Sequence, residues 1–307
     1  MKNKIKDLIS IEYLNRDEIT EIFDLAQSMK ANKNKYYQAL DKKVLAMVFE
    51  KPSLRTRFTF ETGIFELGGH GIYLGPQEIQ LGKRESIYDA AKNLERWAHG
   101  IVIRTFAHSN VTEFSETVII PVINGLDDLV HPCQALTDLY TLREKIENLS
   151  ALTLAWVGDG NNVAHSLMWI CAKLGVNMNL GVPDGYEPNK EITLKVVKEA
   201  SKNNAEIRIF HDPDEAVRNA DAVYTDVWTS MGRETEAERR KKFFKPFQVN
   251  SRLMDKARPG AYFMHCLPAH RGDEVTDEVI DSIRSIVFEQ AENRLHVAKA
   301  IIYLLMR

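Results

Sequence analysis

The sequence predicts an α/β protein of two doubly wound parallel-sheet domains, with the active site in the cleft between them. Short apolar runs typical of buried strands alternate with helical patterns along most of the chain, which is the rhythm of parallel sheets covered by helices. The rhythm restarts after the polar stretch 144–150, and a length of 307 residues suits two domains of ordinary size.

The first half of the chain begins with a helix and continues as alternating strands and helices. Apolar residues recur at helical spacing from Ile19 to Met29, and Asn15 with Glu18 resembles a capping box at the start of that helix. Strands are expected at 44–49, 101–103 and 118–123, and helices at 58–67, 86–97 and 134–146.

The second half repeats the alternation and ends in a long helix. Strands are expected at 152–157, 177–182, 206–210, 222–225 and 261–265. The last helix carries one apolar stripe, made of Ala291, Leu295, Ala298, Ile302 and Leu305. We expect a first domain at 1–148, a second at 149–287, and a C-terminal helix at 288–307 that packs back on the first domain.

Charge and cysteine content exclude several classes of protein. The formal net charge of -3 predicts no polyanion-binding surface, so nucleic acid is not an expected partner. Three scattered cysteines form neither a disulfide framework nor a zinc motif, which fits a reducing cytoplasm. No apolar run is long enough for a membrane span and the N-terminus shows no signal peptide, so we expect a soluble cytoplasmic protein.

A candidate anion site follows the strand at 44–49. Ser53, Arg55, Thr56 and Arg57 lie between this strand and the helix at 58–67. Free N–H groups at a helix start, hydroxyl donors and guanidinium groups together favour a bound anion at the carboxyl end of a strand. A serine cap followed by solvated arginines explains this segment equally well when it is taken alone.

Two further segments favour the anion site. The strand at 101–103 ends in Arg104, and the strand at 118–123 leads to the His-Pro-Cys-Gln segment 131–134. Each alone has an ordinary explanation, as an arginine that reaches solvent or as a structural histidine. Because all three segments lie at the same edge of one predicted sheet, they offer donors for a phosphate and for a carbonyl oxygen beside it.

The strand at 152–157 leads into a turn that is similar to the glycine-rich turn of dinucleotide-binding proteins. Its sequence is Gly-Asp-Gly-Asn-Asn-Val, residues 158–163. Val163 replaces the third glycine of that pattern, and the asparagines offer donors and acceptors that suit an amino acid. A nicotinamide-dependent dehydrogenase therefore remains an alternative, which Val163 disfavours.

Two more segments at strand ends carry groups that suit an amine. Asp226 follows the strand at 222–225 and can hold an ammonium group, and the segment 230–242 after it resembles a mobile lid or, alternatively, a solvated loop. The strand at 261–265 ends in His265 and Cys266, which suit a metal ligand pair, a thiol nucleophile or a group that orients an amine. We assign Cys133 and Cys171 to packing.

Taken in order, these motifs resemble the aspartate and ornithine carbamoyltransferase family over essentially the whole chain. The matching segments are Ser53 to Arg57, Arg104, His131 to Gln134, Asp226 to Gly232, and His265 to Pro268. Within the family, the ornithine branch is favoured by Cys133, by the Ser-Met-Gly lid at 230–232 and by the His-Cys-Leu-Pro segment at 265–268.

The resemblance implies a role for particular residues. It implies that carbamoyl phosphate is bound by Ser53, Leu54, Arg55, Thr56, Gln80, Arg104, His131, Gln134, Cys266, Leu267 and Arg294. It implies that L-ornithine is bound by Asn162, Asp226, Ser230 and Met231, and that Arg104, His131 and Cys266 are catalytic. It also implies no cofactor, no metal, and a homo-oligomer that is a trimer or a multiple of one, in which the loop at Gln80 reaches a neighbouring subunit.

The expected reaction is direct attack of the neutral δ-amine of ornithine on carbamoyl phosphate, which gives L-citrulline and phosphate. The donor is already activated, so no covalent intermediate is needed and Cys266 is expected to orient the amine. One departure is Leu54, where the ornithine enzymes usually have threonine. It leaves N-acylornithine open as the accepting amine, although Asp226 suits the free α-amine of ornithine. Putrescine is a further alternative amine. Synthetic or degradative use of the reaction stays open as well.

Overall fold

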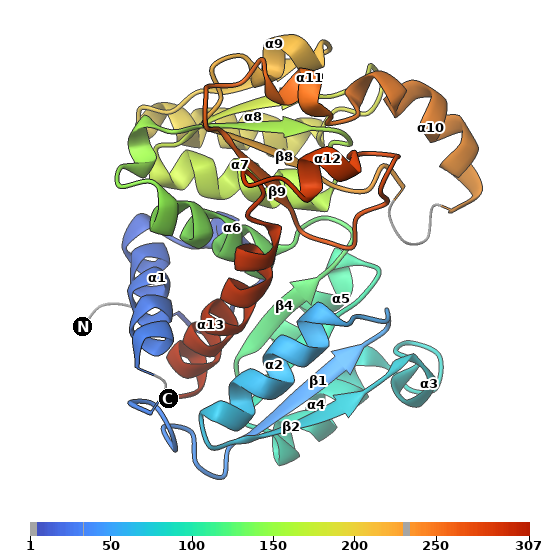
Figure 1. The fold of residues 1–307 in the computed structure, drawn as a ribbon. Coiled ribbons are helices and arrows are strands. Elements are labelled where there is room, and N and C mark those ends of the chain that lie inside the picture. The colour runs from blue at the N-terminus through green and yellow to red at the C-terminus, as the bar shows by residue number, and fades with distance from the viewer. Residues whose placement is uncertain (1–4, 33, 230–233) are drawn as a thin grey trace. The chain divides into compact units, whose positions relative to one another are not determined.

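The computed structural model describes residues 5–32, 34–229 and 234–307 and divides them into two compact units (Figure 1). Unit 1 comprises residues 1–140 and 292–307, and unit 2 comprises residues 141–291. The divisions fall inside two helices, α6 (Pro132–Lys145) and α13 (Val287–Met306). None of the helices in the described ranges is both long and apolar enough to span a bilayer.

Unit 1 is built on a four-stranded parallel sheet with the strand order β2-β1-β3-β4. The strands are β1 (Val44–Phe49), β2 (His70–Leu74), β3 (Gly100–Arg104) and β4 (Val122–Leu126). The helical elements are η1 (Ile11–Tyr13), α1 (Arg16–Ala31), α2 (Arg55–Glu66), α3 (Pro76–Ile79), α4 (Ile87–Trp97), α5 (His108–Thr117), most of α6 and most of α13. Asn15 and Glu18 form the expected capping box at the start of α1.

Helices cover both faces of the unit 1 sheet. Alternate strand residues such as Ala46, Val48 and Ile101 pack with α4 and α5, whose buried side chains include Leu94 and Phe114. On the other side of the sheet α2 lies against α13, and Figure 1 shows these two helices side by side.

Unit 2 is built on a five-stranded parallel sheet with the strand order β7-β6-β5-β8-β9. The strands are β5 (Thr153–Val157), β6 (Asn177–Gly181), β7 (Ile207–Phe210), β8 (Ala222–Thr225) and β9 (Tyr262–His265). The helical elements are η2 (Leu149–Ala151), α7 (Asn162–Leu174), α8 (Lys190–Lys202), α9 (Pro213–Val217), η3 (Glu234–Glu236), α10 (Ala237–Phe244), η4 (Lys245–Phe247), α11 (Ser251–Met254) and α12 (Asp277–Ile280).

The strand order of each sheet reverses at one switch point. In unit 1 the chain goes from β1 outward to β2 and then returns to place β3 on the other side of β1. In unit 2 it goes from β5 to β6 and β7 and then returns to place β8 on the other side of β5. Ligands in open parallel sheets bind beyond the carboxyl ends of the strands at such switch points. The candidate sites are therefore the residues after β1 and β3 and the residues after β5 and β8.

The predicted α/β class with two parallel-sheet domains is confirmed, and the predicted strands correspond to β1 and β3 to β9. The expected start of β4 at residue 118 is wrong, because Val118 is the C-cap of α5 and Pro121, which lacks an N–H donor, precedes the ladder. Strand β2 was not predicted. It is a half-exposed edge strand that begins His-Gly and so lacks a continuous apolar run.

Candidate active site

Unit 1 gathers the residues expected to bind an anion at its switch point. We call them the anion cluster, which comprises Ser53, Arg55, Thr56, Arg104, His131, Gln134 and Arg294. Arg55 and Thr56 are the first residues of α2, Arg104 ends β3, and His131 directly precedes α6. The sheet therefore brings cationic and donor side chains from distant parts of the sequence to one edge.

Hydrogen bonds join three helices of unit 1 within the anion cluster. Arg294 on α13 donates from Nη2 to the Thr56 hydroxyl at 2.9 Å and from Nη1 to the Gln134 side-chain oxygen. Gln134 in turn donates to the Asp138 carboxylate at 2.7 Å. These side chains are buried, so the bonds fix the Arg294 guanidinium at the start of α2.

The buried His131 side chain is surrounded by positive charge. Burial lowers the pKa of its imidazole well below the ordinary value, and the positive charges of Arg294, Arg104 and Arg55 lower it further. Three guanidinium groups thus act on one buried ring. A neutral imidazole donates a single N–H to a nearby oxygen and adds no charge to a site that already holds arginines.

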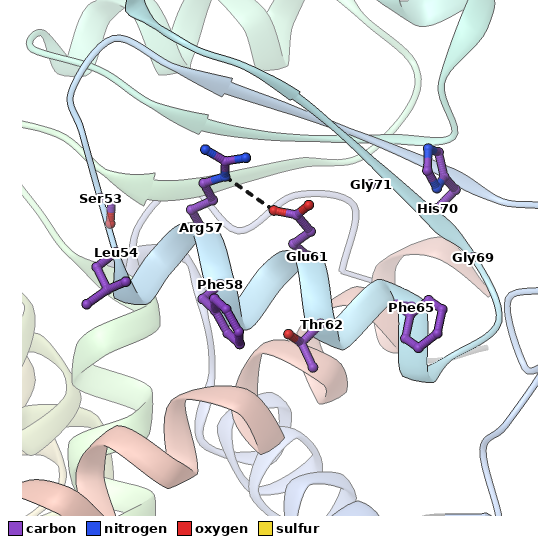
Figure 2. Close-up of a pocket in the computed structure, with 10 residues that line it drawn as sticks. All are labelled: Ser53, Leu54, Arg57, Phe58, Glu61, Thr62, Phe65, Gly69, His70 and Gly71. Atoms are coloured by element: carbon purple, nitrogen blue, oxygen red, sulfur yellow. Dashed lines mark hydrogen bonds and ion pairs between the residues drawn. The ribbon is translucent and has the colours of Figure 1, made fainter.

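The start of α2 leaves backbone N–H groups for a ligand. Its N-cap, Leu54, makes no side-chain cap bond, and the Ser53 hydroxyl accepts only the N–H of Thr56, at 3.2 Å, among the described contacts of that turn. Arg57, which was expected at the anion site, instead pairs with Glu61 at 3.3 Å and lies over the Tyr73 ring, 3.8 Å from its centre. Figure 2 shows Arg57 beside Glu61 on α2.

Lys51 is a candidate that the sequence interpretation missed. It follows β1 by two residues, it is 6% exposed, and its Nζ lies 4.4 Å from the centre of the Phe106 ring. Burial lowers its pKa, and the charge of Arg104 lowers it as well. A lysine placed directly after a buried strand was the available signal, because that is where ligands bind.

Unit 2 places a carboxylate at its own switch point. Asp226 directly follows β8 and is 8% exposed. Its Oδ2 accepts a hydrogen bond of 2.9 Å from Asn161, and its Oδ1 accepts the Cys266 thiol at 3.0 Å and the N–H of Val227 at 2.8 Å. Asn161 and Cys266 therefore orient the carboxylate, as suits a group that holds an ammonium ion. The role of Asn161 in this arrangement was not predicted.

The structure explains the sequence of the glycine-rich turn after β5 without a bound dinucleotide. Gly158 has a φ of +141°, and a Cβ on Gly160 would lie 2.2 Å from the backbone nitrogen of Pro188. The space at Gly160 is thus filled by the chain itself. Asn161 accepts the N–H groups of Val163 and Ala164, the first turn of α7, which a pyrophosphate would otherwise use. Both observations disfavour the dehydrogenase alternative.

Arg240 on α10 ties this turn to the segment that contains Asp226. It is 1% exposed, it pairs with the Asp159 carboxylate, and its Nε donates to the Trp228 carbonyl at 2.5 Å. The guanidinium also lies over the rings of Tyr186 and Phe244. A buried arginine therefore couples the positions of the two segments at the switch point of unit 2.

His265 and Cys266 differ in their surroundings. The ligand atoms of Asp226, His265 and Cys266 lie within 4.8 Å of one another, which a metal site would require. Both ring nitrogens of His265 are engaged, because Nδ1 accepts the N–H of Leu267 at 2.8 Å and Nε2 lies 3.1 Å from Glu274. Only the Cys266 thiol faces Asp226, which suits the expected orienting role.

Several expected ligand residues have structural surroundings that leave their roles as predictions. Gln80 is exposed at the end of α3, and the Leu54 side chain is 72% exposed in the groove of Figure 2. Leu267 packs against the core of unit 2 with a φ of +57°, and Asn162 begins α7. Ser230 and Met231 lie outside the described residues.

Sequence families and solved structures resemble the chain over nearly its whole length. Residues 6–144 match the carbamoyl-P binding domain of aspartate/ornithine carbamoyltransferase, and residues 150–305 match its Asp/Orn binding domain. The chain is 49% identical over 303 residues to the ornithine carbamoyltransferase of Thermococcus kodakarensis, with 98% of this chain and 96% of the relative covered.

Two solved structures are similar in fold as well as in sequence. The ornithine carbamoyltransferase from Pyrococcus furiosus matches with a TM-score of 0.96 and 46% identity, covering 98% of this chain and 97% of that one. The ornithine carbamoyltransferase from Thermus thermophilus matches with a TM-score of 0.88 and 43% identity, covering 99% of both chains. With cationic and carboxylate groups at the two switch points and with both domains matched, the chain belongs to the aspartate/ornithine carbamoyltransferase family.

Proposed function

We propose that the protein is an ornithine carbamoyltransferase, which transfers the carbamoyl group of carbamoyl phosphate to the δ-amine of L-ornithine. The observation that carries the proposal is the division of charge between the switch points. Unit 1 presents arginines around a neutral histidine, and unit 2 presents the Asp226 carboxylate. The first suits a dianionic donor and the second suits an amino acid with a free ammonium group. The similar proteins from Thermococcus kodakarensis and Pyrococcus furiosus are ornithine carbamoyltransferases, which supports the same proposal.

The anion cluster binds and activates the donor. Arg55 and backbone N–H groups at the start of α2 bind the phosphate, with Arg294 held beside them by Thr56 and Gln134. Arg104 and the neutral His131 donate to the carbamoyl oxygen, where negative charge develops during the attack. Donors already fixed by the protein need no reorganisation at that moment.

Asp226 and its partners bind the acceptor. The carboxylate holds the α-ammonium group of ornithine, while Asn161 and Cys266 fix the carboxylate itself. A δ-amine that comes close to the arginines that hold the donor loses its proton, because a second cation there is disfavoured. The neutral nitrogen forms a bond to the carbamoyl carbon, the bond from that carbon to the phosphate oxygen breaks, and phosphate takes the proton that the nitrogen releases.

A thiol intermediate is not part of this mechanism. Burial raises the pKa of the Cys133 thiol to about 12, and its Sγ lies 3.3 Å from the Asn124 carbonyl in the interior of unit 1. Such a thiol stays protonated and does not attack. The Cys266 thiol donates a hydrogen bond to Asp226 and acts through the orientation of that carboxylate. Direct transfer between the two substrates is therefore the simpler route.

The identity of the accepting amine is the part of the proposal that an assay tests most simply. Carbamoyl phosphate is offered with L-ornithine, N-acetylornithine and putrescine in separate reactions, and the ureido product is measured. Ornithine is expected to react fastest, because N-acetylornithine has no α-ammonium group and putrescine has no α-carboxylate. A preference for N-acetylornithine, to which Leu54 would then contribute, would refute the assignment of ornithine.

We also propose that copies of this chain form a trimer, or a multiple of one, through unit 1. The outer side of α2 and strand β2 line a groove of about 800 Å³. Figure 2 shows Phe58 and Phe65 along it, and they are 68% and 72% exposed. Apolar side chains in such a row favour burial against a second copy. Light scattering is expected to show a trimer that Phe58→Glu dissociates.

A cytoplasmic location remains a further proposal. The Cys266 thiol donates a hydrogen bond to Asp226, and oxidation of this thiol would remove that bond. The reducing cytoplasm keeps thiols reduced, which supports this location. Mild oxidation is expected to stop citrulline formation by the wild type, and a reducing agent is expected to restore it. A Cys266→Ala variant is expected to show no such response to oxidation.

A further inference from the structure

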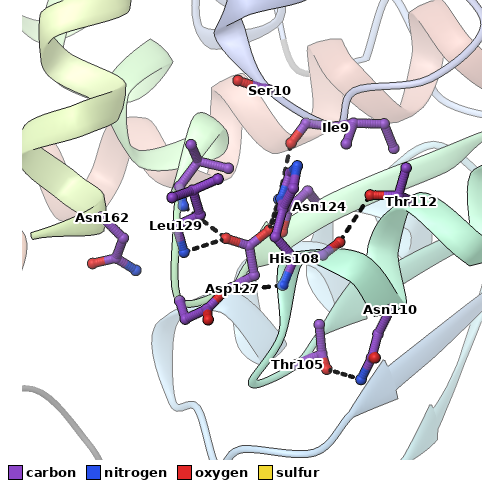
Figure 3. Close-up of polar contacts among 12 residues, drawn as sticks. Ile9, Ser10, Thr105, His108, Asn110, Thr112, Asn124, Asp127, Leu129 and Asn162 are labelled. Atoms are coloured by element: carbon purple, nitrogen blue, oxygen red, sulfur yellow. Dashed lines mark hydrogen bonds and ion pairs between the residues drawn. The ribbon is translucent and has the colours of Figure 1, made fainter. Parts of the chain in front are cut away.

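Asp127 and His108 form a close pair beside the turn that leads to His131. Asp127 is fully buried between β4 and α6, and its Oδ2 lies 2.5 Å from Nδ1 of His108, the first residue of α5. Figure 3 shows the His108 ring and the Asp127 carboxylate pointing toward one another. The mechanism described above uses neither residue, although Asp127 is only four positions before His131.

The Asp127 carboxylate fixes the backbone of the turn that follows it. Its Oδ1 accepts the N–H groups of Leu129 and Val130 at 2.8 and 2.7 Å, and the N–H of Asp127 donates to the Val130 carbonyl at 3.1 Å. Val130 directly precedes His131, whose carbonyl accepts the N–H of Gln134 in the first turn of α6. The carboxylate therefore sets the direction in which His131 leaves the turn.

Three parts of unit 1 hold this turn. Asn124 on β4 donates from Nδ2 to Asp127 at 2.7 Å and to the Ile9 carbonyl at 2.9 Å. The Asp128 carboxylate accepts the backbone N–H of His108 at 2.9 Å. It caps α5 in place of the N-cap residue Ala107, which makes no side-chain cap bond. The turn is thus tied to β4, to α5 and to the N-terminal segment.

The charges around His108 favour its protonated form. The hydrogen bond to Asp127 raises its pKa most, and the charges of Asp127, Asp128 and Glu12 raise it further, against the opposing effect of burial. These carboxylates come from the turn after β4 and from η1, the elements that face the ring. The proton is therefore held to a higher pH than on an ordinary histidine and is lost as the pH rises through the raised pKa.

We propose that the Asp127–His108 pair is a pH-sensitive positioning element for His131, which keeps the carbamoyl phosphate end of the site in its binding geometry while His108 is protonated. The proposal rests on the proposed function, because it assigns carbamoyl phosphate to unit 1. Loss of the proton removes the positive partner of a buried carboxylate and loosens the turn. Carbamoyl phosphate then binds more weakly, whereas ornithine, which Asp226 in unit 2 holds, binds as before.

Two variants of His108 separate its hydrogen bond from its charge. His108→Asn keeps an N–H donor near the position of Nδ1 but does not titrate, and His108→Ala removes the donor. The full enzyme is assayed for citrulline from neutral to alkaline pH at saturating ornithine, and the KM for carbamoyl phosphate is recorded. His211→Asn is the matched control, because the His211 ring also lies 3.1 Å from a carboxylate, that of Asp184, but in unit 2.

In the wild type and in His211→Asn, the KM for carbamoyl phosphate is expected to rise on the alkaline side. In His108→Asn, which has no titrating group at this position, it is expected to stay within about threefold of that variant's own value at neutral pH, and in His108→Ala to be about tenfold higher than in the wild type already at neutral pH. The KM for ornithine is expected to stay the same in all of them. Calorimetric titration with carbamoyl phosphate checks the same order without turnover.

The proposal is overturned if His108→Asn shows the same alkaline rise as the wild type, because the titrating group then lies elsewhere. If His108→Ala does not fold, His108→Asn still decides the question, because it keeps the donor and the side chain at this position is 25% exposed. A wild-type protein that forms no citrulline would contradict the proposed function instead, so the two failures are distinguishable.

Discussion

The Arg294 guanidinium donates a hydrogen bond of 2.9 Å to the Thr56 hydroxyl, although 238 positions of the chain separate the two residues. Helix α13 can reach the start of α2 because the two helices pack closely. A Cβ on Gly63 of α2 would lie 3.3 Å from Cγ of Lys299, and Lys299 pairs with Glu66 at 2.6 Å. The last helix of the chain thereby fixes the first turn of α2, where we propose that phosphate binds.

Replacement of Arg104 by alanine is expected to lower turnover by about a hundredfold or more, which is typical for the loss of one preorganised oxyanion donor. Arg104 ends β3 and is 7% exposed, so no solvent donor replaces it readily. Citrulline formation at saturating substrates measures the effect. Arg208→Ala, which removes an exposed arginine from β7, serves as the control, and near-normal turnover by Arg104→Ala would refute its assigned role.

Asp226→Asn is expected to weaken ornithine binding by about tenfold to a hundredfold, the usual cost of a hydrogen bond to a charged group. Its partners Asn161 and Cys266 are retained, so the change removes mainly the charge. Calorimetry with each substrate separates the effects, since carbamoyl phosphate binding is expected to stay unchanged. Asp184→Asn, at a carboxylate that is 89% exposed, is the control. Equal weakening of both substrates would count against this division of labour.

Acid is expected to destabilise unit 1 through His131. The unfolded chain binds a proton on this residue near the ordinary pKa of 6.5, whereas the folded chain holds the pKa well below that value. The stabilising contribution is thus fully present above pH 6.5 and is lost as the pH falls toward the lowered pKa. Urea unfolding above and below pH 6.5 is expected to show a smaller loss of stability on acidification in His131→Gln than in the wild type. An equal loss in both proteins would show that His131 is not the group responsible.

Gly160→Ala is expected to destabilise unit 2 by about 1 to 3 kcal/mol, the usual cost of inserting a methyl group into a filled space. Its Cβ would lie 2.2 Å from the Pro188 nitrogen, so the turn that carries Asn161 has to move. Ornithine binding is expected to weaken as well. Gly185→Ala is a useful comparison, because Gly185 has a φ of +83° but no neighbour within 4 Å of the added Cβ. Unchanged stability of Gly160→Ala would contradict the close approach.

Much of the fold could be predicted because its signals are local. Strands β1, β3 and β5 are buried on both faces and therefore appear as apolar runs, and the capping box at Asn15 marks the start of α1. Strand β2 and helix α5 could not be predicted in this way. Each of these elements buries only part of its surface, so its polar residues obscure the hydrophobic periodicity that identifies a strand or a helix.

The candidate site divides in the same manner. Arg104, His131 and Asp226 could be predicted because they lie at or shortly after the carboxyl ends of strands, where ligands bind. Side-chain contacts that no local sequence pattern predicts define the roles of Asn161, Lys51 and the Asp127–His108 pair. Their roles follow from burial and hydrogen bonding, which only three-dimensional packing defines.

The most direct test of the account follows the carbamoyl carbon itself. Carbamoyl phosphate labelled at this carbon is mixed with the enzyme, with and without L-ornithine, and the labelled species are followed by NMR spectroscopy while phosphate is measured. We expect the label to pass to the ureido carbon of citrulline with one phosphate released for each citrulline, and little donor to be consumed without ornithine. Release of labelled carbamate or bicarbonate at the same rate with and without ornithine would contradict this expectation.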